Sequence, residues 1–475
     1  MLAPFDLLAM ILVPLLLGMG ILRLIGIQPR TDPLAYPGLA WILGSLGTAL
    51  IVFAWLFSGP LPSGPDLPRA IALGLAVLFA WLGRRYVTPA SPMPLRQVDS
   101  AERIFFGTVV ALLLILVTLR IIEGDLLPVL IGDEADHWAM KTKLLWESGG
   151  FTSAWHSAMG DSTSIYHKDY PLLNPLLQIW VHLHGQEVLH VVSRLPIQIF
   201  NLAGLLVLAS ALRNVLRPAG AALFLCLAVA PAWSQILART GDADYMVGLG
   251  ALVAFVYAIR AHTTREAPWM RLSCLGLAFM IWSKNESLLY LVSILAAAIC
   301  WGCWHPRRSL QALRWHRSWL WFLAPLAMLA LHVGFNQHFG IRSTFSNHEE
   351  GTLLELLFAN LGENTPIVID YFCSRILFEP SHSNYVFPLM LLMILSFRKQ
   401  VMPNAVLALP ALTLLIAMAG IIAILIASPV DVHWLLATAA QRVSYQLYFC
   451  WIFWLALASS QLRVSPLLSP RPLGT

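Results

Sequence analysis

Residues 132–171 form the longest polar interval of an otherwise apolar chain, and they hold side chains suited to proton transfer. The interval opens with the adjacent acids Asp133 and Glu134 and ends near a third acid, Asp169. A carboxylate beside a substrate hydroxyl can act as its general base. Asp133 equally suits the N-cap of a helix, because acids in the first turn complement the helix dipole. The pair alone leaves both interpretations open.

An amphipathic helix is predicted to position this acidic pair. One face of the expected helix holds residues that recur at helical spacing: Ala135, Trp138, Ala139, Thr142, Leu145 and Trp146. The opposite face holds Asp136, Lys143 and Glu147. This pattern is typical of a helix that lies along a membrane surface.

Composition and the distribution of apolar residues identify the class of protein. Of 475 residues, 58% are hydrophobic and 12% are charged, and the mean hydropathy is +0.72. A single soluble core of this size does not need so much apolar surface, whereas apolar runs of about 20 residues cross a bilayer as helices. The sequence therefore predicts an all-α, polytopic membrane protein. Its about 13 transmembrane helices are expected at 6–26, 37–58, 69–83, 104–122, 188–213, 219–237, 242–261, 271–283, 286–303, 318–336, 384–397, 404–427 and 443–460.

The charges between the spans give an orientation. About 19 of the 30 basic residues fall in alternate loops that contain few acids. Because basic loops remain cytoplasmic, the N-terminus and the 123–187 loop are expected outside and the C-terminus inside. The first span has no preceding basic residue and no cleavage site, so it is expected to be a true span. Residues 352–378 are apolar but interrupted, and we expect them to be interfacial or half-buried.

No internal repeat stands out, and a basic stretch divides the chain. Residues 1–103 are expected to form a three-span leader followed by a basic cytoplasmic linker, and residues 104–475 a ten-span core. The net charge of +5 reflects the asymmetry of the membrane and indicates no nucleic-acid partner. The cysteines are scattered, and Cys300 and Cys303 are interpreted as packing residues.

With this topology, ionisable residues at several span ends converge on the outer face. Besides Asp133 and Glu134 they include His167 and Asp169, Arg239, Asp242 and Asp244, Lys284 and Glu286, and Arg442. Ionisable groups near membrane depth usually face a cavity or a partner, so a charged cavity is expected there.

Each of these residues also has a structural interpretation. Asp242 could cap the 242–261 span, Lys284 and Glu286 could pair only with each other, and Arg442 could extend its head group to the interface. A metal at His182, His184 and His190 is not favoured, because ligand spacing is lacking. No cofactor is required. A divalent metal on Asp133, Glu134, Asp242 and Asp244 is possible but not favoured.

Five short motifs, taken in order, resemble a known family. They are Gly132-Asp133-Glu134, Tyr170-Pro171-Leu172, Ser193-Arg194-Leu195-Pro196, the pair Arg239 and Asp244, and Ser283-Lys284-Asn285-Glu286. Together they are similar to the GT-C superfamily of polytopic glycosyltransferases. The pattern is closest to its family 39 type, bacterial branch, which is related to protein O-mannosyltransferases and the lipid A aminoarabinose transferase. The resemblance covers about residues 104–303 and excludes the three leader spans. Asn285 and Glu286 depart from it, since relatives often have small residues there.

The resemblance implies a GT-C-like core with amphipathic surface helices, and transfer of a sugar from a polyprenyl-phosphate donor to an acceptor hydroxyl. The acceptor would be an envelope glycan, a glycolipid or a protein, at the outer face of the bacterial cytoplasmic (inner) membrane. Asp133 is the expected base, with Glu134 orienting it, and a single base predicts inversion at the anomeric carbon. Lys284, Arg239 and Arg442 are expected to bind the donor phosphate. Substrate positioning is expected from Asp244, Asp242, His167, Asp169 and Glu286. The alternatives are a transporter or flippase for a lipid-linked or anionic solute, and a non-enzymatic envelope scaffold.

Overall fold

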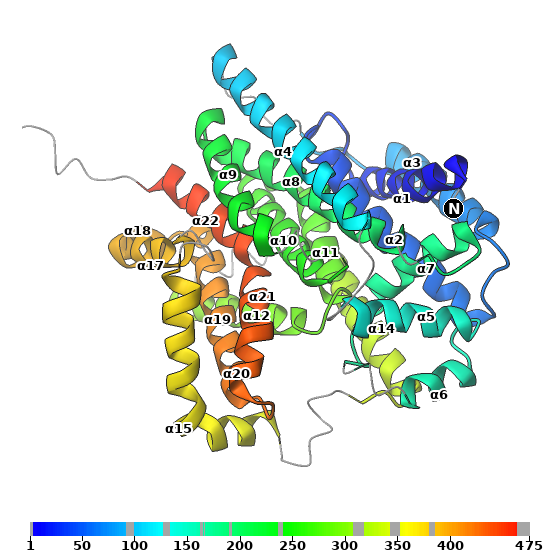
Figure 1. Cartoon of the computed structure of the whole chain (residues 1–475). Helices are drawn as coiled ribbons and strands as arrows, with labels where there is room; N and C mark the ends of the chain where they lie inside the picture. The colour runs from blue at the N-terminus through cyan, green and yellow to red at the C-terminus, as the bar shows by residue number, and fades with distance from the viewer. Residues whose placement is uncertain are drawn as a thin grey trace, which may run out of the picture.

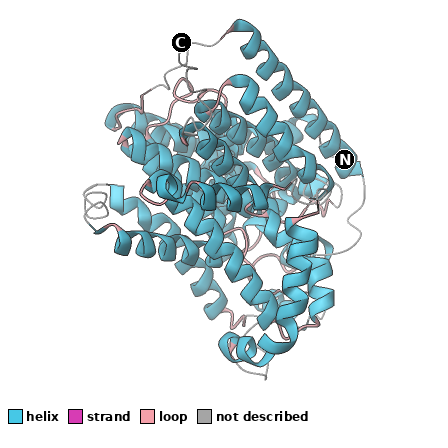
Figure 2. Cartoon of the chain, turned by 90° about the vertical axis from the view of Figure 1, so that its left-hand side faces the viewer, coloured by secondary structure: helices cyan, strands magenta, loops and turns pink. Residues whose placement is uncertain are grey.

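The computed structural model describes residues 3–91, 99–126, 134–161, 165, 167–189, 192–235, 241–306, 318–342, 352–379 and 385–462. Within these ranges every regular element is a helix and there is no strand, as Figure 2 shows. The all-α prediction is therefore confirmed for the described part of the chain.

The long helices follow the predicted spans closely. Their bounds are α1 Pro4–Ile25, α2 Tyr36–Ser58, α3 Asp66–Tyr86, α4 Ser100–Leu126, α8 Leu195–Val215, α9 Pro218–Gln235, α10 Asp244–Thr264, α11 Ala267–Ile281, α12 Ser287–Trp304, α14 Leu323–His338, α17 Val386–Ser396, α19 Ala405–Ala427 and α22 Tyr448–Gln461. In the described residues, nine helices are long and apolar enough to cross a membrane. Each of the thirteen predicted spans overlaps a helix, but four of these helices are not among the nine. They are α11, α17 and α22, with 15, 11 and 14 residues, and α9, whose apolar stretch is Pro218–Ala230. Because a span needs about 20 residues, the predicted number of thirteen is not established.

Short elements connect these helices. They are η1 Glu134–Ala139, α5 Met140–Glu147, α6 Ser153–Asp161, α7 Leu173–Gly185, η2 Val192–Arg194, η3 Ser318–Phe322, α15 Leu353–Tyr371, η5 Phe372–Leu377, α18 Arg398–Val401, α20 Val432–Leu435, η6 Leu436–Ala440 and α21 Gln441–Tyr445. The predicted amphipathic helix corresponds to η1 followed by α5. Its expected apolar face is buried at Trp138, Thr142 and Leu145.

Small residues allow the first helices to pack closely. A Cβ atom on Gly18 of α1 would lie 1.7 Å from the backbone oxygen of Ala40 in α2, and one on Gly44 would lie 1.7 Å from the oxygen of Pro14. The two backbones are therefore in direct contact, which is how small residues associate apolar helices where no hydrophobic force operates between them. Larger side chains at these glycines would separate α1 from α2.

The leader helices pack on the rest of the chain. The indole Nε1 of Trp41 in α2 donates to the oxygen of Pro196 at 3.3 Å, and that of Trp180 in α7 donates to the oxygen of Met10 at 3.0 Å. In Figure 1, α1 and α2 lie beside α7, and Arg69 of α3 donates to His184 of α7 at 2.9 Å. The proposed boundary at residue 103 therefore separates sequence segments that share one packed interior.

Residues 352–378, expected to be interfacial, form α15 and η5. Thr352 and Glu355 make a reciprocal capping box at the start of α15. Helix α15 then packs along α19 (Figure 1), with Leu356 and Val368 buried. It is not among the nine candidate spans, and its position relative to the membrane surface stays a prediction.

Candidate functional site

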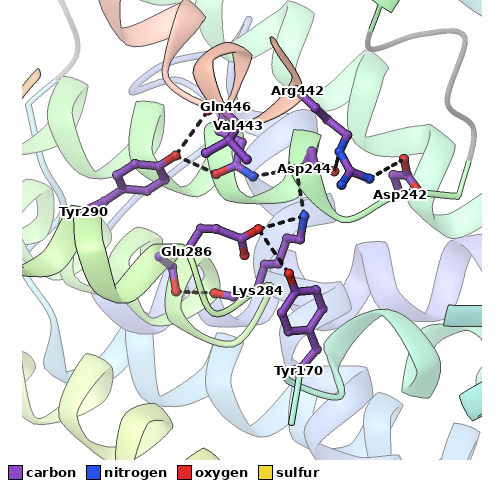
Figure 3. Close-up of polar contacts among 10 residues, drawn as sticks. Tyr170, Asp242, Asp244, Lys284, Glu286, Tyr290, Arg442, Val443 and Gln446 are labelled. Atoms are coloured by element: carbon purple, nitrogen blue, oxygen red, sulfur yellow. Dashed lines mark hydrogen bonds and ion pairs between the residues drawn. The ribbon is translucent and has the colours of Figure 1, made fainter. Parts of the chain in front are cut away.

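The centre of the site is Lys284, in the short break between α11 and α12. Its side chain is 0% exposed. The Nζ atom lies 3.0 Å from Asp244 Oδ1 and 3.0 Å from Glu286 Oε1 (Figure 3). Removing an ammonium group from water is costly unless counter-charges surround it, and two carboxylates do so here. The break in the helix pair thus places Lys284 between an acid of its own loop and an acid of α10.

Asp244 connects Lys284 to the C-terminal part of the chain. Arg442 of α21 approaches two acids: its Nη1 lies 3.7 Å from Asp242 Oδ2 and its Nε lies 3.7 Å from Asp244 Oδ2. Gln446 Nε2 donates to Asp244 Oδ1, and Tyr290 of α12 donates to Gln446 Oε1 at 2.6 Å. These contacts hold α21 against the N-terminal ends of α10 and α12 (Figure 3).

The segment before α7 adds further contacts to the network. The Tyr170 hydroxyl donates to Glu286 Oε1 at 3.2 Å, and Asn285 Nδ2 donates to Asp169 Oδ2 at 2.7 Å. The ring of His167 stacks on that of Tyr170, with centroids 4.4 Å apart and an interplanar angle of 8°. The pair of residues 169 and 170 therefore fixes the loop that carries Lys284.

Lys141 of α5 is a buried cation beside the site that the sequence did not single out. It is 1% exposed, its Nζ donates to the oxygen of Tyr170 at 3.3 Å, and the rings of Trp138 and Tyr170 lie 5.8 Å away. Burial lowers the pKa of Lys141 to about 7, and the nearby Asp169 carboxylate opposes that shift. Its spacing contained the signal, because Lys141 lies three residues after Trp138 and four before Leu145, on the buried face.

Glu134 lies at the edge of this site in a second ion pair. Its Oε1 is 2.8 Å from Arg194 Nη1, and the two side chains are 15% and 3% exposed. A Cβ atom on Gly241 would lie 2.5 Å from Glu134 Cγ. Glu134 therefore packs on the turn that precedes Asp242.

The structure brings most of the sequence-predicted residues together. Asp242, Asp244, Lys284, Glu286 and Arg442 form one network, and Asp169 and His167 contact its partners Asn285 and Tyr170. Glu134 lies in its own pair with Arg194. Asp133 and Arg239 lie outside the described residues, and the roles assigned to all these residues stay predictions.

The structure tests the structural interpretations of Lys284, Asp242 and Arg442 one by one. Lys284 does pair with Glu286, but the pair extends to Asp244. Asp242 is not the cap of α10, which begins at Asp244 with no side-chain cap. Arg442 is 14% exposed and lies against acids. Among the described residues, no group of three or more His, Cys, Asp or Glu side chains is placed to hold a metal ion.

Comparison with known proteins gives limited information. No family model and no curated protein matches the chain. The chain is similar to the crystal structure of ArnT from Cupriavidus metallidurans bound to undecaprenyl phosphate, with a TM-score of 0.47 and 14% sequence identity. The alignment covers 77% of this chain and 61% of that chain, so the chain spans less than two thirds of its length. Likeness at this level establishes neither a family nor an activity.

Proposed function

We propose that the chain is a membrane glycosyltransferase of the GT-C type. It moves a sugar from a polyprenyl-phosphate donor to an acceptor hydroxyl at the outer face of a bacterial inner membrane. One observation carries the proposal: charged residues from α10, from the break between α11 and α12, and from α21 meet in one network beside a surface segment. A transfer that releases a lipid phosphate needs this combination of cations and carboxylates near the bilayer surface.

Arg442 is the proposed direct contact of the donor phosphate. The network holds two cations, Lys284 and Arg442, against three carboxylates, so its formal charge is −1. An anion therefore has to draw a cation away from its acids. Lys284 is 0% exposed with two contacts at 3.0 Å, whereas Arg442 is 14% exposed with contacts at 3.7 Å. Because its contacts are longer and its head is more accessible, Arg442 can turn toward phosphate at the smaller electrostatic cost.

Lys284 then acts by fixing the acids. Its ammonium orients the Asp244 and Glu286 carboxylates, and Tyr170 holds Glu286 from the other side. Asp244, Asp242 and Glu286 are proposed to position the donor sugar, whose hydroxyls donate to carboxylates. Arg239 is proposed as a further phosphate contact.

Asp133 is proposed as the general base that removes the proton from the acceptor hydroxyl. Attack by the activated hydroxyl displaces the lipid phosphate and inverts the anomeric carbon. Glu134, the next residue, is held by Arg194 and packs on the turn before Asp242. No metal-dependent step is part of the proposal.

The test uses the full chain in lipid nanodiscs with a polyprenyl-phosphate sugar and a mixture of envelope glycolipids. Release of polyprenyl phosphate with appearance of a glycosylated acceptor is the expected result. Asp133→Asn should abolish release while leaving binding of polyprenyl phosphate unchanged, and Asp136→Asn, a neighbouring acid on the predicted polar face, is the matched control. Movement of the intact donor across a bilayer without phosphate release would instead identify a flippase.

A further inference from the structure

An open pocket of about 790 Å³ lies between α15–η5 and α20–η6, apart from the ion-pair network described above. Its polar walls are formed by Asp370, Tyr371, Ser374, Arg375, Glu379 and His433. The contacts of Lys284, Asp244 and Arg442 described above are made with other residues. A concave surface of this size with a few convergent polar groups is the usual form of a small-ligand site.

The frame of the pocket is fixed by side-chain hydrogen bonds. Asn360 and Asn364 of α15 donate to the oxygens of Ser428 and Ile426 at 3.4 and 3.1 Å, which ties α15 to the end of α19. Asp431 accepts from the backbone N–H of Trp434 at 2.8 Å and caps α20. The two walls are therefore held in a defined relation by α19 and the turn that follows it.

The chemistry of the pocket favours a ligand rich in hydroxyl groups. Ionised carboxylates only accept hydrogen bonds, and Asp370 presents an exposed one. Glu379 is 28% exposed and pairs with Arg375 at 3.1 Å. Sugar hydroxyls donate to such acceptors, and the Tyr371 ring supplies an apolar face beside them. Its two carboxylates and one guanidinium give a formal charge of −1, which disfavours phosphorylated ligands.

We propose that this pocket binds a neutral or amine-bearing saccharide, the sugar that accepts the transferred residue. The assignment as an acceptor depends on the proposed transferase function, whereas saccharide binding does not. The pocket lining includes Ala437 of η6, and Arg442 follows five residues later. Since α21 follows η6 directly, the two residues lie little more than one helical turn apart along the chain. A saccharide in the pocket would thus lie next to the proposed phosphate contact.

The test measures direct binding to the full chain in nanodiscs, without donor. The probes are neutral, amine-bearing and phosphorylated oligosaccharides, each free and attached to a lipid, together with a serine-rich peptide. We expect the neutral and amine-bearing saccharides to bind, and comparison of the free and lipid-attached forms shows whether the lipid contributes. Preference for phosphorylated saccharides, or binding of the peptide alone, would overturn the proposal.

Substitutions of pocket residues test whether the saccharide binds in this pocket. Asp370→Asn and Glu379→Gln each remove a charged acceptor and should weaken saccharide binding about ten- to hundredfold. The matched control is Glu363→Gln, an exposed acid on α15 that is not in the pocket lining. Equal affinity in all three variants would exclude the pocket.

One comparison separates this proposal from the transferase proposal. If the wild-type chain binds saccharide through Asp370 and releases no polyprenyl phosphate, the pocket stands and the transferase proposal fails. If transfer occurs and its KM for acceptor is unchanged by Asp370→Asn, the pocket is not the acceptor site.

Discussion

Lys141→Met should change how the stability of the protein depends on pH. Lys141 is buried against the Trp138 and Tyr170 rings, and burial lowers its pKa from 10.5 to about 7. The protonated form is thus disfavoured in the folded state. Between about pH 7 and 10.5 the unfolded chain holds this proton and the folded chain does not, so the free energy of unfolding rises with pH. Above 10.5 neither state holds it, and below 7 both do.

The magnitude follows from the shift. One pKa unit corresponds to about 1.4 kcal/mol, so the Lys141 contribution grows by about 1.4 kcal/mol per pH unit within this window. Over the whole window, the folded state loses about 5 kcal/mol as the pH falls. Met has a similar length and no charge, so the variant removes this slope. It should also be more stable than the wild type near neutral pH, although it loses the hydrogen bond to the oxygen of Tyr170.

The assay is reversible unfolding in bicelles between about pH 7 and 9, where the wild type and Lys141→Met should differ in slope by about 1.4 kcal/mol per pH unit. Subtracting one slope from the other removes the contributions of all other titrating groups, because both proteins share them. Lys143→Met is the matched control, since Lys143 is 47% exposed on the same helix and pairs with Glu147 at 3.8 Å. Its slope should equal that of the wild type. Equal slopes for Lys141→Met and the wild type would refute the reasoning.

Three further predictions concern the ion-pair network. Lys284→Met should lower the free energy of unfolding by about 3–5 kcal/mol, because it leaves the buried Asp244 and Glu286 without the cation between them. Adding the substitutions D244N and E286Q to this variant should recover most of the lost stability in the same unfolding assay. Arg442→Gln should weaken binding of polyprenyl phosphate at least tenfold, and unchanged affinity would exclude Arg442 as the contact. Tyr170→Phe should cost about 1.5–3 kcal/mol in unfolding experiments, the value of one hydrogen bond to the charged Glu286 carboxylate.

The sequence was sufficient to predict that charged residues far apart in the chain lie close together, because successive spans cross the membrane in alternate directions. Residues at the outer ends of successive spans share one depth, so Asp244, Lys284 and Arg442 were expected on one face. The structure joins them through contacts of 3.0 and 3.7 Å. This part of the prediction required only span boundaries and loop charges.

The depth of each side chain could not be predicted in the same way. Lysines are rarely buried, so residue type alone places Lys141 and Lys143 alike in water, although one is 1% exposed and the other 47%. Only the helical spacing of Lys141, on the face of Trp138 and Leu145, distinguishes the two. Gln446 was not selected either, because an uncharged amide in an apolar run has no distinctive pattern. Its importance arises from contacts with Asp244 and Tyr290, 202 and 156 residues away in sequence.

The contacts between the leader spans and the rest of the chain could not be predicted from the sequence either. Asp32, in the turn between α1 and α2, is 3% exposed and lies 3.0 Å from Arg260 Nη1 at the end of α10. Ser210 and Tyr257 also donate to its carboxylate, and the Arg260 guanidinium stacks 3.4 Å from the centre of the Trp269 ring. A buried arginine that loses its acid retains an uncompensated charge. The interior of α8, α10 and α11 therefore depends on a residue from the leader, and a chain that begins at residue 104 would lack a counter-charge that its core requires.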